Sequence, residues 1–371
     1  MLRTRAMWFL LIAIGSVTFT GAQDKKPVKN DEDEVIRVDT ELVEVPVVVA
    51  DRAGRPVLGL KQTSFVVSED GKPQQITEFS STSAPFEVAL LLDTSGSARS
   101  ELQLIQRAAQ SFINSLRPGD RVSIIAFHTE TKDKRPTPVA EILTGLTNDR
   151  SALSGAIEKM TTSNGTPYYD SLLKIAEKVF GDPAKPEFRG RRAIVALTDG
   201  VDSTSASGFE EARELLAESG VICYFIKVDT REFFEQNLLG DCHVAIRFSA
   251  AQIRRYYRIF AGSKVESTGD FCQLGDFERL AISKRLYELA TEEMNSLAKA
   301  SGGKVFPVND LSEARSAFKS VADEIGTKYS LGYYSSNEKR DGTYRKIKVD
   351  VKGLPLGTQV RAREGYTAPV R

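Results

Sequence analysis

Two kinds of hydrophobic pattern alternate along this chain. In its middle, four short and nearly continuous apolar runs at residues 86–92, 122–127, 193–197 and 221–228 predict strands with both faces buried. Between these runs, apolar residues at helical spacing in residues 102–116, 172–180 and 209–216 predict amphipathic helices. The alternation predicts an α/β fold: a doubly wound, mostly parallel sheet with helices on both faces.

The two ends of the chain show a two-residue alternation instead. Apolar and polar positions alternate in residues 42–49 and 65–79, and again in residues 329–333 and 347–351. Asp70-Gly71 lies between alternating segments, which is typical of a hairpin turn, and Asp341-Gly342 predicts a turn between the C-terminal segments. Each patch has only about 40 to 50 residues, too few for a comfortably stable sheet alone. We therefore expect the two patches to complete one β-sandwich, into which the α/β domain is inserted.

These patterns divide the chain into segments. Residues 1–22 resemble a secretory signal peptide, because Arg3 and Arg5 precede an apolar run that small residues follow. An uncleaved membrane anchor is the alternative, but the run is shorter than the roughly 20 residues that a span needs. Residues 23–34 read as a solvated linker. We expect the sandwich halves at residues 35–84 and 327–371, and the α/β domain at residues 85–326 with an insertion at 229–285.

Composition narrows the classes of function. The chain has 371 residues, 50 basic and 50 acidic, and 41% are hydrophobic, which is typical of a folded protein. Loss of Arg3 and Arg5 with the signal peptide would leave 48 basic and 50 acidic residues, a formal charge of −2. A near-neutral chain argues against nucleic-acid binding, which needs a basic field. After cleavage we expect no transmembrane span and a secreted, periplasmic or cell-envelope location.

Oxygen-bearing side chains follow the predicted strands. Asp93, Ser95 and Ser97 follow the first, Asp199 follows the third, and Thr166 lies in the loop before a predicted helix. In such sheets, ligands bind beyond the carboxyl ends of the strands. Carboxylate and hydroxyl oxygens without sulfur or imidazole suit Mg²⁺.

This pattern resembles the metal-ion-dependent adhesion site of von Willebrand factor type A domains: Asp-x-Ser-x-Ser, a distant Thr and a distant Asp. All five positions are present, and Asn164-Gly165-Thr166 is similar to the family's Gly-Gly-Thr loop with Asn in place of one Gly. The resemblance covers roughly residues 85–326. The flanking segments, with Asp70-Gly71-Lys72 and Arg363-Glu364-Gly365-Tyr366, resemble secreted bacterial proteins related to this family and typical of acidobacteria.

The resemblance implies a role for each residue and a function. Ser95, Ser97 and Thr166 would contact Mg²⁺, or Mn²⁺ or Ca²⁺, while Asp93 and Asp199 balance its charge through bound waters. A carboxylate of a partner protein would fill the remaining position, so the expected function is that of an exported, non-enzymatic adhesion module. The alternative is a periplasmic or envelope assembly or scaffolding factor with a structural metal and a partner-binding sandwich. For a single hydroxyl the alternative also remains that Ser95 or Ser97, in a Ser-rich turn, caps the helix that begins near Glu101.

Enzymatic motifs are absent from the sequence. The loop after the first strand lacks Gly-x-Gly-x-x-Gly, and no P-loop or Gly-x-Ser-x-Gly motif occurs. The only histidines, His128 and His243, lie outside such motifs, and a loop-anchoring role is favoured for His128. An unrecognised metal-dependent hydrolase is the third and weakest hypothesis.

The insertion carries two further features. Cys242 and Cys272 lie 30 positions apart, and in a secreted protein we expect them to form a disulfide worth roughly 3 kcal/mol; free thiols or an intermolecular bridge are the alternatives. Cys223, within an apolar strand, is expected to be an inert buried thiol. Arg254, Arg255 and Arg258 lie in a basic stretch with helical spacing. That stretch is either an amphipathic helix packed on its own domain or a surface that selects an acidic partner.

Overall fold

A six-stranded sheet lies at the centre of the α/β domain. The computed structural model describes residues 42–80, 84–95, 101–132, 134–261 and 270–370. The strand order is β10-β9-β8-β5-β6-β7, and all neighbours are parallel except β7, which runs antiparallel to β6. The strands are β5 (Glu87–Leu92), β6 (Arg121–Lys132), β7 (Arg135–Thr147), β8 (Arg192–Thr198), β9 (Ile222–Val228) and β10 (Lys304–Val308).

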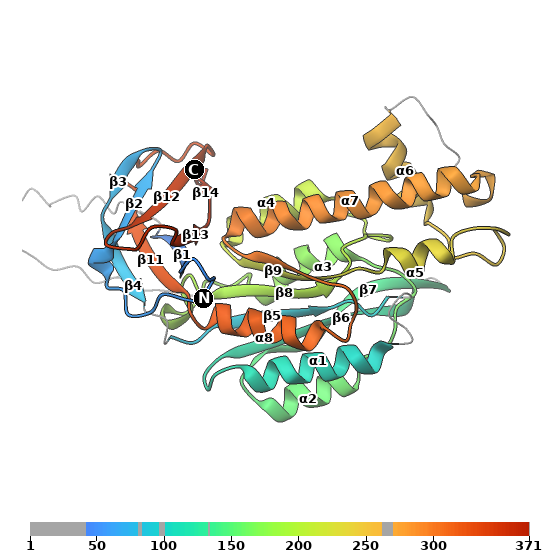
Figure 1. Ribbon diagram of the computed structural model, residues 1–371, viewed down its shortest axis with the longest axis horizontal. Coiled ribbons are helices and arrows are strands. Elements are labelled where there is room, and N and C mark those ends of the chain that lie inside the picture. The colour runs from blue at the N-terminus through green and yellow to red at the C-terminus, as the bar shows by residue number, and fades with distance from the viewer. Residues whose placement is uncertain (1–41, 81–83, 96–100, 133, 262–269, 371) are drawn as a thin grey trace, which may run out of the picture. The chain divides into compact units, whose positions relative to one another are not determined.

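Helices cover both faces of this sheet (Figure 1). One face carries α1 (Leu102–Ser115), α2 (Arg150–Glu158) and α8 (Ala314–Ile325). The other carries α3 (Tyr168–Lys174), α4 (Phe209–Ser219) and α7 (Asp276–Ser301). The insertion holds two shorter helices, α5 (Arg231–Gln236) and α6 (Ala250–Tyr256), and α6 continues as a π-helical turn, Tyr257–Ala261. The predicted doubly wound α/β fold is confirmed.

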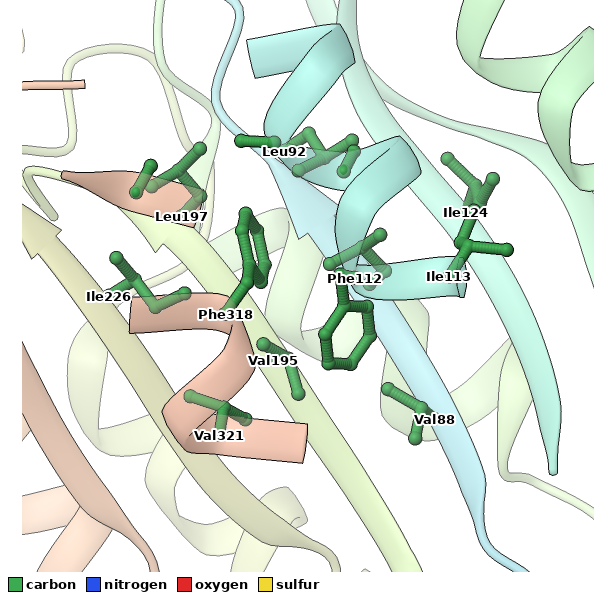
Figure 2. Close-up of a cluster of buried hydrophobic side chains, with 14 of the residues drawn as sticks. Val88, Leu92, Phe112, Ile113, Ile124, Val195, Leu197, Ile226, Phe318 and Val321 are labelled. Carbon is green, nitrogen blue, oxygen red and sulfur yellow. The ribbon is translucent and has the colours of Figure 1, made fainter. Parts of the chain in front are cut away.

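Burial on both faces explains the continuous apolar runs. Along β5, Val88, Leu90 and Leu92 belong to the core under α1 and α8, whereas Ala89 and Leu91 belong to the core under α3, α4 and α7. Figure 2 shows the first of these cores, where α1 and α8 meet over the sheet. Phe112 and Phe318 form that contact, with ring centroids 5.2 Å apart. A polar residue at any of these strand positions would face one core or the other.

The chain ends build a β-sandwich of two four-stranded sheets, as predicted. The sheet orders are β13-β1-β11-β4 and β14-β12-β2-β3, so each sheet combines strands from both ends. From the N-terminal side come β1 (Leu42–Ala50), β2 (Phe65–Glu69), β3 (Lys72–Gln74) and β4 (Ile76–Ser80). From the C-terminal side come β11 (Tyr329–Tyr334), β12 (Tyr344–Val351), β13 (Gln359–Ala362) and β14 (Gly365–Thr367). One apolar cluster, which includes Val45, Val67, Leu331 and Ile347, joins the two sheets.

The hairpin predicted at Asp70-Gly71 joins β2 to β3. Glu69 pairs with Lys72 across the turn, and φ is 47° at Asp70 and 80° at Gly71. Two successive residues with positive φ are what a type I′ turn needs, and Asp and Gly tolerate that conformation. The local sequence therefore sets the register of this hairpin.

Buried hydrogen bonds hold the two places where the chain passes between sandwich and α/β domain. Arg191 is fully buried and donates to the carbonyl oxygens of Ala84 and Pro85, which precede β5, and of Lys328, which precedes β11. Arg363, on the sandwich side, donates to Ala217 O at 3.1 Å. The Arg191 guanidinium thus binds both connecting segments.

Several sequence predictions concern residues outside the described ones. These are the signal peptide at residues 1–22, the linker at 23–34 and Ser97. Of the helices that the structure does describe, none combines the length and apolar character needed to cross a membrane.

Candidate metal centre

The candidate site lies where the chain connections diverge from the sheet. From β5 the chain continues to β6 on one side, and from β8 it continues to β9 on the other, which leaves a crevice beyond the carboxyl ends of β5 and β8. Leu92 and Leu197 are partners in the last rung between the two strands. Asp93 follows directly, and Asp199 follows after Thr198, so the parallel register brings these two carboxylates to the same edge.

Hydrogen bonds join the three loops that carry the predicted ligands. Thr198 Oγ1 donates to Asp93 Oδ2 at 2.6 Å, which links the first and third loops. Ser163 N donates to Thr94 O at 2.8 Å, which links the first loop to the Thr166 loop. Thr166 N donates to Ser203 Oγ at 2.8 Å, which links that loop to the segment after Asp199. The structure therefore gathers Asp93, Ser95, Thr166 and Asp199 at one edge.

Close packing explains the Gly retained in the Thr166 loop. A Cβ at Gly165 would lie 2.7 Å from Thr204 Cγ2 and 2.8 Å from Pro138 Cγ, closer than real Cβ atoms come. Asn164, by contrast, is exposed. The loop can accept Asn at the first position of the family's Gly-Gly-Thr pattern, whereas the second position has no room for a side chain.

The two carboxylates are buried, and the charge of Lys227 offsets that of Asp199 only in part. Asp93 is 7% exposed and Asp199 is 9% exposed, and no ion pair in the described part of the chain joins either to Lys or Arg. Burial raises the pKa of Asp93, although hydrogen bonds from Ser95 and Thr198 oppose the shift. For Asp199, burial first and then the negative charge of Asp93 raise the pKa.

A divalent cation would fit this donor set. Asp93 Oδ1 accepts from Ser95 N at 3.0 Å, and Asp199 Oδ1 accepts from Val201 N at 2.9 Å, so both carboxylates are held in place. Ser95 and Thr166 are buried beside them. The site offers only oxygen ligands and two negative charges that repel each other, which is chemistry that favours Mg²⁺ or a similar hard ion.

A pocket extends from these carboxylates toward the core. Its lining consists of Asp93, Glu101, Ile105, Leu197, Thr198, Asp199, Val228, Thr230 and Leu311. Glu101 is the N-cap residue of α1 and makes no capping hydrogen bond with its side chain. The N-cap position of α1 is thus Glu101 and not Ser95, and Ser97, the other candidate cap, lies outside the described residues.

His128, Asp170 and Cys223 have anchoring or packing roles. His128 Nδ1 lies 3.1 Å from Thr161 Oγ1, a contact between β6 and the loop after α2. Asp170, in the first turn of α3, accepts from Ala206 N at 2.9 Å and Ser207 N at 3.0 Å. Cys223 is a free, buried thiol, and burial raises its pKa to about 12.

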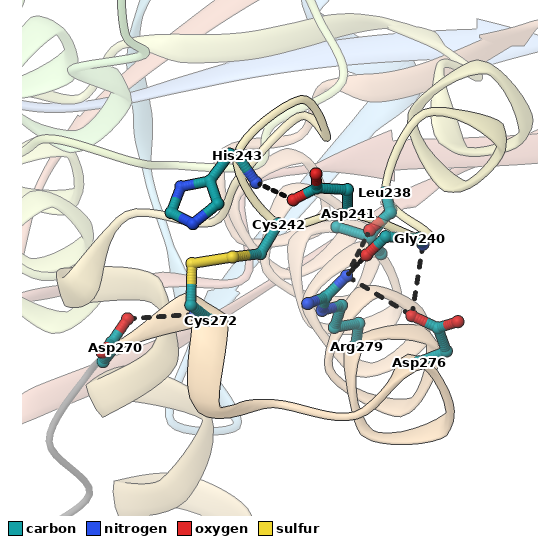
Figure 3. The surroundings of a disulfide bond; sticks show 9 residues. All are labelled: Leu238, Gly240, Asp241, Cys242, His243, Asp270, Cys272, Asp276 and Arg279. Atoms are coloured by element: carbon teal, nitrogen blue, oxygen red, sulfur yellow. Dashed lines mark hydrogen bonds and ion pairs between the residues drawn. A yellow bond between two sulfur atoms is a disulfide. The ribbon is translucent and has the colours of Figure 1, made fainter.

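The insertion is braced by the disulfide that joins Cys242 to Cys272 (Figure 3). Beside it, Arg279 donates to Leu238 O at 3.3 Å and to Gly240 O at 2.9 Å. His243 lies next to the bridge and is exposed. The loop is thus fixed covalently at one point and by a buried guanidinium at another.

The three arginines of the basic stretch do not share one environment. Arg254 and Arg258 are exposed. Arg255 instead pairs with Glu293 of α7 at 2.6 Å and lies over the ring of Tyr169, 4.9 Å from its centroid. Arg255 therefore holds α6 against the domain, and only Arg254 and Arg258 face solvent.

Sequence reasoning missed the hydroxyl groups that hold the carboxylates. Thr198 bonds Asp93, and Thr230 Oγ1 donates to Asp199 Oδ2 at 2.5 Å. Thr198 is the last residue of β8, and Thr230 comes two residues after β9. Their positions at strand ends were the available signal, since neighbouring parallel strands end at the same edge.

Comparison with known proteins shows what the domain is similar to. A family model described as the von Willebrand factor type A domain matches residues 88–201, a span that includes all five predicted ligand positions. A comparison with curated protein sequences found no match. Among solved structures, the conserved hypothetical protein BatB from Bacteroides thetaiotaomicron is 19% identical, with 65% of this chain and 98% of that chain covered and a TM-score of 0.39.

Two further structures are similar at low identity. The von Willebrand factor type A protein from Catenulispora acidiphila is 10% identical, with 90% of this chain and 74% of that chain covered and a TM-score of 0.41. Proximal thread matrix protein 1 from the mussel byssus is 13% identical, with 74% and 51% covered and a TM-score of 0.40. Residues 88–201 match the von Willebrand factor type A domain model, and these residues carry the loops that the structure gathers at one sheet edge.

Proposed function

We propose that this protein is an exported, non-enzymatic adhesion module that binds a carboxylate of a partner protein through a divalent ion. Domains of this family generally serve protein interaction or adhesion. In this chain Asp93, Ser95, Thr166 and Asp199 would hold the ion, together with Ser97, which lies outside the described residues. Bound there, Mg²⁺, Mn²⁺ or Ca²⁺ would supply the positive charge that an anionic group of the partner needs.

One observation carries this proposal: two buried carboxylates meet at the sheet edge, and among the described residues neither forms an ion pair with Lys or Arg. An ionised carboxylate in an apolar environment is costly unless it is paired or coordinates a metal. The hydrogen bonds from Thr198 and Thr230 orient Asp93 and Asp199 but do not neutralise them. A divalent ion would relieve both charges at once, and the residues present are the ones it prefers.

Export is supported by the cysteines. The paired Cys242 and Cys272 are typical of a protein that folds in an oxidising compartment, such as the periplasm or the extracellular space. The remaining cysteine, Cys223, is buried in β9, where it cannot exchange with that bridge. A thiol count of one on the denatured, unreduced protein would agree with this location, and a count of three would argue against it.

A second candidate function is an envelope assembly or scaffolding factor in which the sandwich binds the partner and the metal is structural. Exposed apolar side chains on the sandwich favour it: Tyr344 is 57% exposed and Leu356 is 97% exposed. Exposed residues of this kind occur at protein interfaces. This candidate predicts that a Tyr344→Ser variant loses the partner while an Asp93→Ala variant keeps it.

Calorimetric titration tests the metal directly. Wild-type protein should release or absorb heat with at least one of Mg²⁺, Mn²⁺ and Ca²⁺, whereas Asp93→Ala and Ser97→Ala should bind far more weakly. Asp323→Ala, which removes an exposed carboxylate on α8, is the matched control and should bind like wild type. Absence of heat from wild type with all three ions would refute the metal site.

A pull-down from envelope extract, with and without chelator, tests the function. The adhesion proposal expects one or more partners that are lost on chelation and lost with Asp93→Ala at an unchanged melting temperature. If Asp93→Ala lowers the melting temperature but keeps the partner, the scaffolding function replaces it.

A further inference from the structure

A chain of hydrogen bonds connects α7 to Asp199. Thr230 Oγ1 donates to Asp199 Oδ2 at 2.5 Å, and the same hydroxyl lies 2.9 Å from Tyr287 Oη. Tyr287 is 7% exposed, and Thr230 is half-buried and lines the pocket that contains both carboxylates. The two residues come from the loop after β9 and from the middle of a 26-residue helix.

The direction of this chain follows from counting hydrogens. Thr230 has one hydroxyl hydrogen, and the Asp199 carboxylate can only accept, so that hydrogen goes to Asp199 Oδ2. Tyr287 must then donate its own hydrogen to the Thr230 oxygen. Each hydrogen bond polarises the next, so the bond from Tyr287 strengthens the hydrogen bond that Thr230 donates to Asp199.

Asp199 is fixed at both oxygens. Oδ1 accepts from Val201 N at 2.9 Å, and Oδ2 accepts from Thr230. A carboxylate oxygen has two lone pairs, so each oxygen keeps one that faces away from its protein donor. The orientation of these free lone pairs is therefore decided by Val201 and Thr230.

A second contact from α7 supports the same loop. Met294 packs against Gly200, where an added Cβ would lie 2.7 Å from Met294 Cε. Gly200 has φ of 75°, a left-handed conformation that favours Gly, so the turn after Asp199 is shaped for this close approach. Helix α7 thus contacts the Asp199 loop through a polar chain at Tyr287 and through apolar packing at Met294.

We propose that Thr230 and Tyr287 are positioning residues of the metal centre, which hold Asp199 in the orientation that the divalent ion requires. The inference rests on the proposed function, since it concerns the affinity of the same site. Partners of metal ligands in the surrounding layer typically change metal affinity by 10- to 100-fold when they are removed. The hydroxyl of Thr230, rather than its bulk, is the group that matters.

The test compares Mn²⁺ dissociation constants from calorimetry for the full chain and four variants. Thr230→Val keeps the shape but removes the hydroxyl, and should weaken binding about 10-fold. Thr230→Ser keeps the hydroxyl and should bind within about twofold of wild type, and Tyr287→Phe should weaken binding about threefold, since it acts only through Thr230. Thr291→Val removes another hydroxyl of α7, which donates to Tyr287 O at 2.8 Å, and should leave affinity unchanged.

The outcomes separate this inference from the proposed function. Wild-type affinity in Thr230→Val, or an equal loss in Thr230→Ser or in Thr291→Val, overturns the positioning role while the metal site stands. No binding by wild type overturns both. Urea unfolding of each variant without metal measures whether a variant with weakened binding is still folded. Partial unfolding of Thr230→Val that accounts for its weaker binding would also overturn the inference.

Discussion

Glu69→Gln should destabilise the β-sandwich by about 4 kcal/mol, because it breaks a buried ion pair. Glu69 and Arg345 have side chains 2% and 3% exposed, and Arg345 Nη1 lies 3.5 Å from Glu69 Oε1. Glu69 comes from β2, whereas Arg345 comes from β12 at the other end of the chain. The pair therefore helps to join the two sequence segments of the sandwich.

The magnitude follows from the neighbours of Glu69. Its carboxylate also accepts from Tyr333 Oη at 2.8 Å and from Tyr366 Oη at 2.9 Å. Both tyrosines donate to Oε2, whereas Ser335 and Arg345 donate to Oε1, so a Gln side chain turns its amide donor toward one of these two pairs of donors. Removing one partner of a buried pair costs about 3–5 kcal/mol, and an unsatisfied buried donor about 1–3 kcal/mol. These contributions overlap, so about 4 kcal/mol is expected in total.

Urea unfolding at pH 7 measures this change. Glu78→Gln is the matched control, because its ion pair with Arg189 is solvent-exposed and should contribute less than about 1 kcal/mol. In Glu69→Gln combined with Arg345→Met the loss should be smaller than the sum of the two single losses, since no charge is then left unpaired. A loss below about 1 kcal/mol for Glu69→Gln, or strict additivity in the double variant, would refute the reasoning.

Three further changes probe other parts of the molecule. Cys242→Ser with Cys272→Ser opens a loop of 30 positions and should lower stability by about 3–4 kcal/mol, seen as faster proteolysis within the insertion; unchanged cleavage would contradict this. Gly165→Ala should lower the melting temperature because its Cβ meets Thr204, and an unchanged value would show that the loop can move aside. Burial lowers the pKa of Lys328 to about 7, so the unfolded chain binds more protons above that pH and stability should rise with pH from 7 to 9. In Lys328→Met the free energy of unfolding should rise less steeply with pH, by at most about 1.4 kcal/mol per pH unit. Equal pH slopes in wild type and Lys328→Met would contradict this expectation.

The buried strands were predictable from sequence, and the edge strands were not. Strands β5, β8 and β9 are covered on both faces, which leaves apolar runs that are easy to recognise. The edge strand β7 is only partly buried and contains Pro136 and Pro138, residues that argue against a strand. The other edge strand, β10, has five residues including Pro307. Proline is tolerated there because an edge strand has one side without a ladder partner.

The candidate ligands were predictable, but their partners depended on the three-dimensional arrangement. The positions of Asp93 and Asp199 after strands indicated a shared edge. The hydrogen bond from Thr198 to Asp93 requires the register of β5 against β8, two strands about 100 residues apart in sequence. The basic stretch around Arg255 contains no acidic residue, so its sequence left open whether the arginines pack on the domain or select an acidic partner. Its partner Glu293 lies 38 positions away on another helix, where local pattern gives no sign of it.

The two candidate functions place the binding surface at opposite ends of the central strands, so substitutions can separate them. The sandwich is connected at the amino ends of β5 and β8, where Arg191 binds the carbonyl oxygens on both connecting segments. The candidate metal centre lies at the carboxyl ends of the same strands, beyond Leu92 and Leu197. A strand of six or seven residues thus separates the two surfaces, about 20 Å at the usual rise per residue. A small partner carboxylate bound at one edge therefore cannot contact the other, and substitutions at Asp93 and at Tyr344 should affect partner binding independently.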